Sequence, residues 1–218
     1  MKKLLLLRPE PGLSVSEERA RALGLEVLRC PLFRVEPLDW DLPESIHYDG
    51  LLLTSANAVR HAGPKLASLA GLPVHAVGRS TAAAAREAGL NVETTGSGNV
   101  SDLLSGLPTS LKLLHLAGED HRPDGDERID RRITYRSIPI ADPGLPTIDG
   151  LVVAVHSPRA GMRLSELAGQ RNAAQIAAIS NAAAAACGVG WEAIAVAAAP
   201  NDNSLLALAA SLCHKSGQ

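Results

Sequence analysis

The sequence predicts an α/β protein built from two doubly wound parallel sheets, and three observations support this class. First, Asp-Gly followed by a short apolar run occurs twice, at 49–59 and 149–161. Each run is too short for a helix but suits a strand buried on both faces of a parallel sheet. Second, a polar turn and a helical pattern follow each run. Third, strand and helix patterns then alternate in the same order after both copies, which is typical of α/β folds.

The chain before the first copy is expected to form a strand, a helix and a second strand. The apolar run 3–7 predicts the first strand. Helix 15–23 follows, with Ser14 and Glu17 in the positions of a capping box. The apolar segment 25–33 then predicts the second strand.

The first copy continues with two further strand and helix pairs. After its strand, a helix is expected from about 57 to 70. Strand 74–77 precedes helix 82–88, for which Ser80 or Thr81 would be the N-cap. The other elements expected in this half are strand 91–93, helix 100–106, strand 111–116 and strand 133–138.

The second copy repeats this order. Its strand and the Ser157 turn lead to helix 160–168, strand 175–179, helix 182–187, strand 193–197 and helix 204–213. Thr81 precedes Asn99 by 18 positions, and Ala183 precedes Asn201 by 18 as well. Leu-Leu occurs shortly after each asparagine, so the shared spacing indicates a duplication.

One element is displaced between the halves, and this displacement defines the expected domains. The opening segment 4–33 resembles 113–140, which ends the first half. Such a pattern is expected if both chain ends complete one domain and the other domain is inserted between them, with strands 30–37 and 137–144 as an antiparallel two-stranded hinge. The expected boundaries are 1–34 with 145–218 for the first domain, 38–138 for the inserted domain, and 35–37 with 139–144 for the hinge connectors.

Composition excludes several classes of protein. The chain has 218 residues, 21 Lys and Arg against 23 Asp and Glu, and 2% aromatic residues, so it lacks the basic surplus and stacking side chains typical of nucleic-acid binding. No apolar run approaches the roughly 20 residues of a membrane span, and the apolar core of the N-terminal segment is too short for a signal peptide. Three cysteines without a CxxC motif suggest structural thiols in a reducing cytoplasm.

The candidate ligand-binding residues lie in the turns after the expected strands, where open α/β sheets bind ligands. No phosphate-binding loop, dinucleotide fingerprint or nucleophile elbow is present. Hydroxyl, amide and glycine residues at several helix N-termini instead indicate an anionic ligand with many carboxylates or phosphates. The candidates are Thr54, Ser55, Asn57, Gly78, Arg79, Ser80, Thr81, Gly118, Ser157, Arg159, Ser180 and Asn181.

Each candidate also has a structural interpretation. Serine and threonine at these turns would cap helices whether or not a ligand binds. Tyr135 could donate a proton to a leaving group or simply pack at the domain junction. The histidines His115, His121 and His156 lack the spacing of metal ligands, so no metal site is expected.

Several motifs resemble the uroporphyrinogen-III synthase family. They cover nearly the whole chain and occur in the order and spacing of that family: Leu53-Thr-Ser-Ala-Asn-Ala-Val59, Ala76-Val-Gly-Arg-Ser-Thr-Ala82, Ala88-Gly-Leu90, Gly98-Asn99, Tyr135-Arg-Ser-Ile138 and His156-Ser-Pro-Arg-Ala160. The resemblance implies two flavodoxin-like domains joined by a two-stranded ladder. It also implies closure of hydroxymethylbilane to uroporphyrinogen III, with inversion of the last pyrrole ring and loss of water, in a cleft between the domains.

The resemblance implies that no cofactor is needed and that the substrate carries eight carboxylates. By position, Thr81 and Tyr135 match family residues that contact the substrate, and Tyr135 would assist departure of the hydroxyl group. It further implies a cytoplasmic monomer that could receive its substrate from hydroxymethylbilane synthase, with no nucleic acid or membrane as partner. The chain departs from the family at Ala182 and Ala183, where relatives often have threonine, and in the acidic segment 119–132.

Two other functions remain open from the sequence. Duplicated α/β domains also occur in non-catalytic anion-binding or sensor proteins, which would bind an anion without turnover. A nucleotide-sugar enzyme is less favoured because a phosphate loop is absent, but nucleotides that raise the melting temperature would support it.

Overall fold

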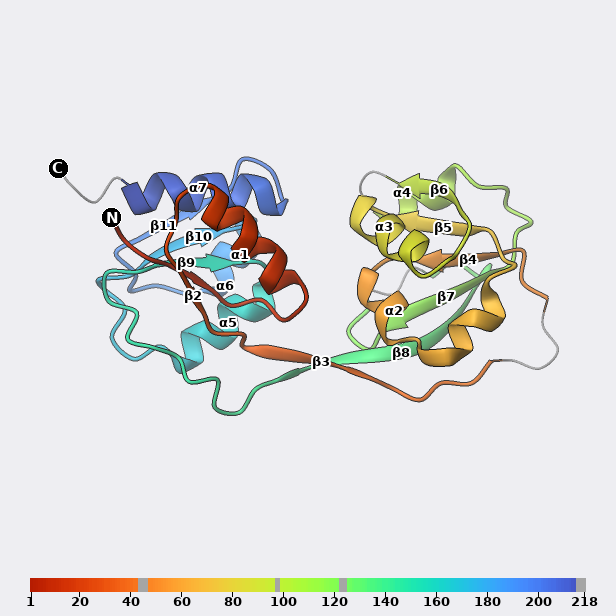
Figure 1. Ribbon diagram of the computed structural model, residues 1–218, viewed down its shortest axis with the longest axis horizontal. Helices are drawn as coiled ribbons and strands as arrows, with labels where there is room; N and C mark the ends of the chain where they lie inside the picture. The colour runs from red at the N-terminus through yellow and green to blue at the C-terminus, as the bar shows by residue number, and fades with distance from the viewer. Residues whose placement is uncertain (43–46, 97–98, 122–124, 215–218) are drawn as a thin grey trace. The chain divides into compact units, whose positions relative to one another are not determined.

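The structure is a computed structural model that describes residues 1–42, 47–96, 99–121 and 125–214. Gly98 of the motif Gly98-Asn99 lies outside these ranges, as do residues 122–124 of the acidic segment 119–132. The chain divides into two compact units, Met1–Arg34 with Pro139–Gln218, and Val35–Ile138. Each unit contains one sheet with helices on both faces (Figure 1). The predicted α/β class with parallel sheets is therefore confirmed.

The first unit contains a sheet of five parallel strands in the spatial order β2-β1-β9-β10-β11. Its strands are β1 (Leu4–Leu6), β2 (Val27–Arg29), β9 (Val152–Val155), β10 (Gln175–Ala178) and β11 (Ala193–Val196). Its helices are α1 (Gly12–Ala22), α5 (Pro158–Leu167), α6 (Asn181–Ala186) and α7 (Asp202–His214). The buried strands read as continuous apolar runs because helices cover both faces.

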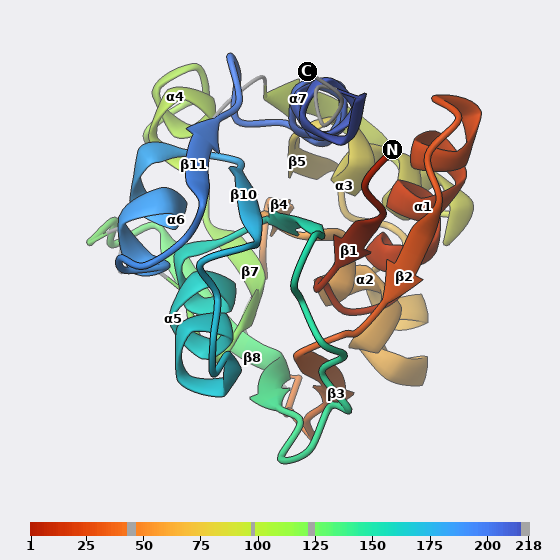
Figure 2. The same ribbon diagram turned by 90° about the vertical axis from the view of Figure 1, so that its left-hand side faces the viewer.

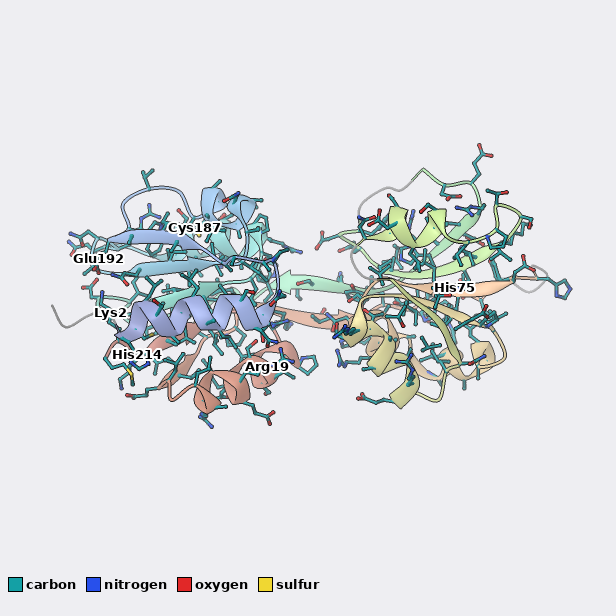
Figure 3. The ribbon with its side chains drawn as sticks, turned by 90° about the horizontal axis from the view of Figure 1, so that it is seen from above. Lys2, Arg19, His75, Cys187, Glu192 and His214 are labelled. Carbon is teal, nitrogen blue, oxygen red and sulfur yellow. The ribbon has the colours of Figure 1, made fainter. Side chains whose placement is uncertain are left out.

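Alternate residues of these strands pack into two separate cores. Leu5 and Val153 point toward α5 and α6, whereas Leu4 and Val152 point toward α1 and α7. The end view shows α5 and α6 on one side of this sheet and α1 on the other (Figure 2). At the amino-terminal side of the sheet, Lys2 Nζ donates to Glu192 Oε2 at 2.7 Å (Figure 3).

The second unit contains a sheet in the order β3-β8-β7-β4-β5-β6. Its strands are β3 (Phe33–Pro37), β4 (Gly50–Leu53), β5 (Val74–Val77), β6 (Val92–Gly96), β7 (Leu113–Gly118) and β8 (Ile129–Pro139). Its helices are α2 (Ala56–His61), the 3₁₀ helix η1 (Gly63–Leu69), α3 (Arg79–Glu87) and α4 (Val100–Ser105). The core on one face packs against α2, η1 and α3, and the core on the other packs against α4.

The division between the units falls within β3 and β8. The two strands are neighbours in the sheet. Leu38 N donates to Thr134 O at 2.9 Å, and Ile140 N donates to Leu32 O at 2.9 Å. Residue numbers therefore rise along one strand as they fall along the other, so these two strands are antiparallel.

Two predicted helix starts are wrong. Helix α1 begins at Gly12, and Ser14 makes no capping box with Glu17, because its backbone N and its hydroxyl both donate to the Glu10 carboxylate, at 3.1 and 2.9 Å. Helix α3 begins at Arg79 with Gly78 as its N-cap, so neither Ser80 nor Thr81 caps it. Gly78 has a φ of 84°, a conformation that glycine adopts without steric cost.

Other element boundaries also differ from the predictions. The predicted strand 25–33 is split into β2 and the start of β3, with Leu32 N bonded to Leu7 O between them. The predicted helix 57–70 becomes α2 followed by η1, because Gly63 at a φ of 69° interrupts it. Strand β8 begins at Ile129, four residues before its predicted start, because its charged residues pair with β7 at this position.

Candidate functional site

The carboxyl edge of the second sheet carries nine of the predicted site residues. Strands β8, β7, β4 and β5 are consecutive neighbours, so the turns that follow them adjoin one another. In open α/β sheets this edge is where ligands bind. The predicted residues on or beside it are Thr54, Ser55, Asn57, Gly78, Arg79, Ser80, Thr81, Gly118 and Tyr135.

The turn after β4 is ordered by a capping hydroxyl. Ser55 is the N-cap of α2, and its Oγ accepts from Asn57 N at 3.1 Å, which confirms the prediction that a residue of this turn caps the helix. Asn57 is partly buried in the first turn of α2 and is not itself the cap. The Ser55 hydroxyl proton is not used in this bond, so it can be donated to a ligand.

Thr54 connects this turn to the interior of the sheet. Its Oγ1 lies 3.1 Å from His115 Nε2, and Arg131 Nε donates to His115 Nδ1 at 3.3 Å. His115 belongs to β7 and is 2% exposed. This contact was not predicted, because His115 lies 61 positions from Thr54 within an otherwise apolar strand.

The turn after β5 presents backbone groups of α3. Arg79 and Ser80 are exposed in the first turn of this helix, whereas Thr81 is 3% exposed. The first N–H groups of a helix have no partner within it and favour anions. Arg79 adds a positive charge beside them, so this turn has the chemistry of an anion-binding site.

Tyr135 lies on β8 with its ring against Gly118, the last residue of β7. A Cβ atom at Gly118 would lie 2.8 Å from the Tyr135 Oη, so only glycine leaves room for the ring. On another side, the ring centroid is 6.1 Å from that of His61 in the last turn of α2. Burial is the main cause that lowers the pKa of His61, followed by the nearby charge of Arg60, which favours a neutral imidazole beside Tyr135.

Two serine-capped helices mark the same edge of the first sheet. Ser157 follows β9 and caps α5, with its Oγ accepting from Ala160 N at 3.2 Å and Pro158 at the first helical position. Ser180 follows β10 and caps α6, with its Oγ accepting from Ala183 N at 3.2 Å. These caps were predicted from the sequence and are confirmed. Asn181 is exposed in the first turn of α6.

Arg159 is the second residue of α5. Its guanidinium carbon is 4.7 Å from the ring centroid of Phe33, a cation–π contact. The two side chains line a hollow of about 250 Å³ with Met162, Arg163 and Glu166. Arg159 therefore lines a shallow, partly apolar surface beside the capped turn.

A partly buried charged cluster at this edge was not predicted. Asp202, the first residue of α7, accepts hydrogen bonds from Arg8 (3.2 Å), Ser16 (2.7 Å), Arg19 (2.9 Å) and His156 (2.9 Å). Arg8 comes shortly after β1 and His156 directly after β9. The cluster therefore joins the ends of neighbouring strands to two helices.

The cluster has a surplus of positive charge. Burial by itself would raise the pKa of Asp202, but the hydrogen bonds from His156, Ser16 and Arg19 outweigh it and hold that pKa well below its usual range. Burial is also the largest cause acting on His156 and lowers its pKa, so its imidazole is favoured in the neutral form. Two guanidinium groups then face one carboxylate, which suits a site near bound anions.

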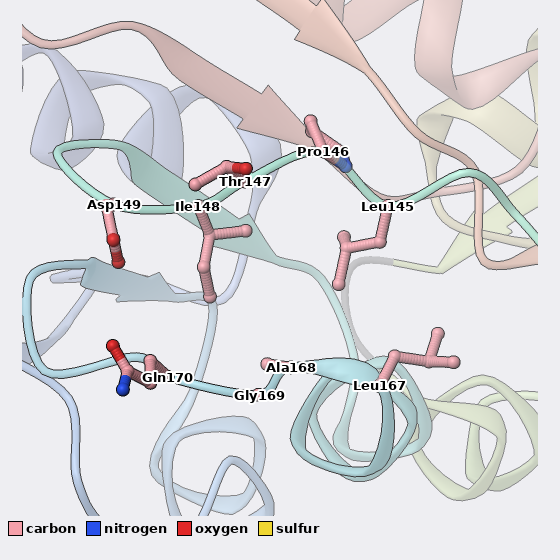
Figure 4. Close-up of a pocket in the computed structure, with 9 residues that line it drawn as sticks. All are labelled: Leu145, Pro146, Thr147, Ile148, Asp149, Leu167, Ala168, Gly169 and Gln170. Carbon is pink, nitrogen blue, oxygen red and sulfur yellow. The ribbon is translucent and has the colours of Figure 1, made fainter.

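A second hollow of the first unit lies elsewhere. It has a volume of about 300 Å³ and is lined by the segment before β9 and the segment after α5 (Figure 4). Asp149 and Gln170 face it, together with apolar side chains. Because it adjoins the amino end of β9, it is separate from the capped turns at the carboxyl edge.

The described part of the chain contains no group of three or more His, Cys, Asp or Glu residues placed to hold a metal ion. Across the same residues, no helix combines the length and apolar character that a membrane crossing requires. The groups described at the two edges are backbone N–H and hydroxyl groups, arginines, the Asp202 and His156 side chains, and the Tyr135 hydroxyl.

Comparison with known proteins identifies similar sequences and folds. A family model described as Uroporphyrinogen-III synthase HemD matches residues 14–207. The crystal structure of uroporphyrinogen-III synthetase from Helicobacter pylori is similar with a TM-score of 0.70 at 16% identity, covering 97% of this chain and 100% of that chain. A mutant uroporphyrinogen III synthase from Thermus thermophilus has a TM-score of 0.53 at 20% identity, covering 95% and 96%. A search of curated proteins finds no match.

Proposed function

Because the chain belongs to the uroporphyrinogen-III synthase family, we propose that it closes hydroxymethylbilane into uroporphyrinogen III, inverting the last pyrrole ring and releasing water. The family match over residues 14–207 is the observation that carries this proposal. The fold similarity to the Helicobacter pylori structure supports it.

The proposal includes two flavodoxin-like domains joined by β3 and β8 as a hinge. Counted in chain order within the first unit, its sheet has the order 2-1-3-4-5, as in flavodoxin. Apart from the edge strand β3, the second unit has the same order if β7 and β8 are counted before β4, β5 and β6. This relationship supports the duplication with a displaced element that the sequence indicates.

The proposed substrate is held by its carboxylates. Helix N-termini that follow β4, β5, β9 and β10 offer unpaired N–H groups, and each can stabilise an anion by about 0.3–1 kcal/mol. The Ser55, Ser157 and Ser180 hydroxyls accept from their own helices and retain a proton to donate outward. Each of these turns can therefore hold one carboxylate of a substrate that has many.

The charged cluster strengthens this proposal for the first unit. Arg8 and Arg19 bring two positive charges to the single carboxylate of Asp202. A substrate carboxylate near this edge would meet a net attractive field, whereas a cationic ligand would be repelled. The anchoring bonds to Asp202 keep both guanidinium groups in fixed positions.

Tyr135 is the proposed aid to leaving-group departure. Its hydroxyl has no hydrogen-bond partner among the described residues, so its proton can be offered to the hydroxyl group that leaves as water. The Tyr135 ring packs against Gly118, where a side chain would leave no room for it. Most of the rate acceleration would come from holding the bilane in a folded geometry, because positioning of reacting groups can contribute about 7–11 kcal/mol.

A direct product assay tests the function. Fresh hydroxymethylbilane is incubated with purified protein, the product is oxidised, and the isomers are separated. We expect the type III isomer, and type I alone would refute the proposal. The non-catalytic binding or sensor function is not favoured by the family and fold findings; it predicts tight anion binding without turnover.

The remaining expectations about cellular context belong to the same proposal. We propose that the chain acts in the cytoplasm as a monomer and takes its substrate from hydroxymethylbilane synthase. Light scattering over a range of concentrations checks the oligomeric state. Faster transfer of substrate in a mixture of both enzymes than through a dialysis membrane would support direct hand-over.

A further inference from the structure

The central strand β7 of the second unit carries one polar side chain within its buried apolar run. His115 is 2% exposed and lies between β4 and β8. Burial of an imidazole in an apolar sheet is unfavourable unless its nitrogen atoms are hydrogen-bonded. Both of them are, because Nε2 contacts Thr54 and Nδ1 contacts Arg131.

These contacts assign the tautomer of His115. An arginine side chain can only donate hydrogen bonds, so His115 Nδ1 must accept from Arg131 Nε. The neutral imidazole then carries its proton on Nε2 and donates it to Thr54 Oγ1 at 3.1 Å. The contact with Arg131 thereby determines the direction of the hydrogen bond to Thr54.

The same contact restricts the hydroxyl of Thr54. Its oxygen accepts from His115, so its O–H must be donated in another direction. No acceptor for this proton exists among the residues that the structure describes. Thr54 directly follows β4 at the carboxyl edge and is only partly buried, so the donor is available to a ligand there.

We propose that His115, held by Arg131, is a positioning residue that directs the Thr54 O–H toward a carboxylate of the substrate. This inference rests on the proposed function and adds to it two residues that orient a substrate-binding hydroxyl. Only Thr54 touches the substrate; His115 and Arg131 act through it. The ligand class is an acetate or propionate side chain of a linear tetrapyrrole.

The sheet supplies a matched control in His75 of β5. Leu52 of β4 is the register partner of both His75 and His115, so the two histidines flank one residue on the same face. Both are 2% exposed. His75, however, packs against Gly50, at the opposite end of β4 from Thr54, and its Nδ1 has no partner among the described residues (Figure 3).

Kinetics of five variants test the proposal. Thr54→Val and His115→Leu should each lower kcat/KM for hydroxymethylbilane about tenfold, mainly through KM, since each removes one oriented hydrogen bond. The double variant should lose about tenfold as well, not a hundredfold, because both changes remove the same interaction. His115→Gln, which retains an N–H donor, should recover part of the loss, and His75→Leu should stay within twofold of the unchanged protein.

Two results would overturn the inference. One is a His115→Leu variant that behaves like His75→Leu, and the other is a double variant whose two losses multiply. Failure of the proposed function is a separate outcome, because the unchanged protein would then form no type III isomer. If His115→Leu does not fold, His115→Gln and Thr54→Val still give the comparison.

A measurement without substrate tests the geometry independently. Nitrogen-15 NMR of the histidine side chains reports which imidazole nitrogen carries the proton. We expect the Nε2–H tautomer for His115 at pH 7.5. The chemical shift of the Nε2 proton should change in Thr54→Val and not in Thr54→Ser. An Nδ1–H tautomer would contradict the assigned hydrogen-bond direction.

Discussion

Gly118 and Tyr135 are register partners on β7 and β8, and a Cβ atom at Gly118 would lie 2.6 Å from Tyr135 Cζ. The absence of a side chain at Gly118 therefore determines where the only tyrosine of the candidate site can lie. The ring rests on the end of the neighbouring strand, and Glu119 N donates to Tyr135 O at 2.9 Å directly beside it.

Gly118→Ala should therefore displace the Tyr135 ring. We expect a loss of about 1–3 kcal/mol in the free energy of unfolding, as is typical of overpacking, together with slower formation of the type III isomer. Urea denaturation and the product assay measure the two effects. Gly71→Ala is the control, because a Cβ there meets nothing within 4 Å, and an equal effect of both changes would contradict this account.

Tyr135→Phe should separate catalysis from stability. The hydroxyl has no hydrogen-bond partner among the described residues, so its removal should change the free energy of unfolding by less than about 0.5 kcal/mol. If the hydroxyl assists departure of the leaving group, kcat should fall at least about tenfold. An unchanged kcat at unchanged stability would remove Tyr135 from the mechanism.

Three helix caps could be predicted from the sequence because capping is a local interaction. Ser55, Ser157 and Ser180 were found because a cap involves groups only two or three positions apart along the chain. The start of α3 was missed because the expectation considered hydroxyl caps at Ser80 and Thr81. The structure instead uses the backbone freedom of Gly78.

Long-range contacts were beyond the reach of sequence patterns. The Asp202 cluster joins residues 186 and 194 positions apart, and no spacing rule relates Arg8 and Ser16 to Asp202. His115 was noted only for its lack of metal-ligand spacing, and its contact with Thr54 depends on the register of β7 against β4. The repeat predicted the order of strands and helices along the chain, but the side-chain contacts depend on the register of the strands in the sheet.

Asp202→Asn should make the free energy of unfolding vary less with pH in the acid range. The pKa of Asp202 is lowered in the folded protein from its ordinary value of 3.8, so its charged form stabilises the fold above that value and this contribution is lost as pH falls below it. At pH 7 the substitution should reduce the free energy of unfolding by about 2–4 kcal/mol, because Arg8 and Arg19 lose their charged partner.

The difference in free energy of unfolding between the unchanged protein and Asp202→Asn should become smaller as pH falls below 3.8. Chemical denaturation at a series of pH values measures it. Glu166→Gln is a suitable control, because Glu166 pairs with Arg163 on the surface of α5 and is 62% exposed. A pH-independent difference for Asp202→Asn would show that its charge does not stabilise the fold.

Gly161→Ala should loosen the packing between α5 and α6. A Cβ at Gly161 would lie 2.9 Å from Ala183 O and 3.2 Å from Cys187 N, and backbone atoms cannot rotate away. We expect a loss of about 1–3 kcal/mol in the free energy of unfolding. Gly169→Ala, where nothing lies within 4 Å, should have little effect, and equal losses would contradict the close approach.

The time course of both uroporphyrinogen isomers at increasing protein concentration tests the central claim most directly. We predict that the initial rate of type III formation rises in proportion to protein while the type I yield falls, because the enzyme and spontaneous closure compete for one bilane. A type I yield that is unaffected by protein, with no type III isomer at any concentration, would contradict the account.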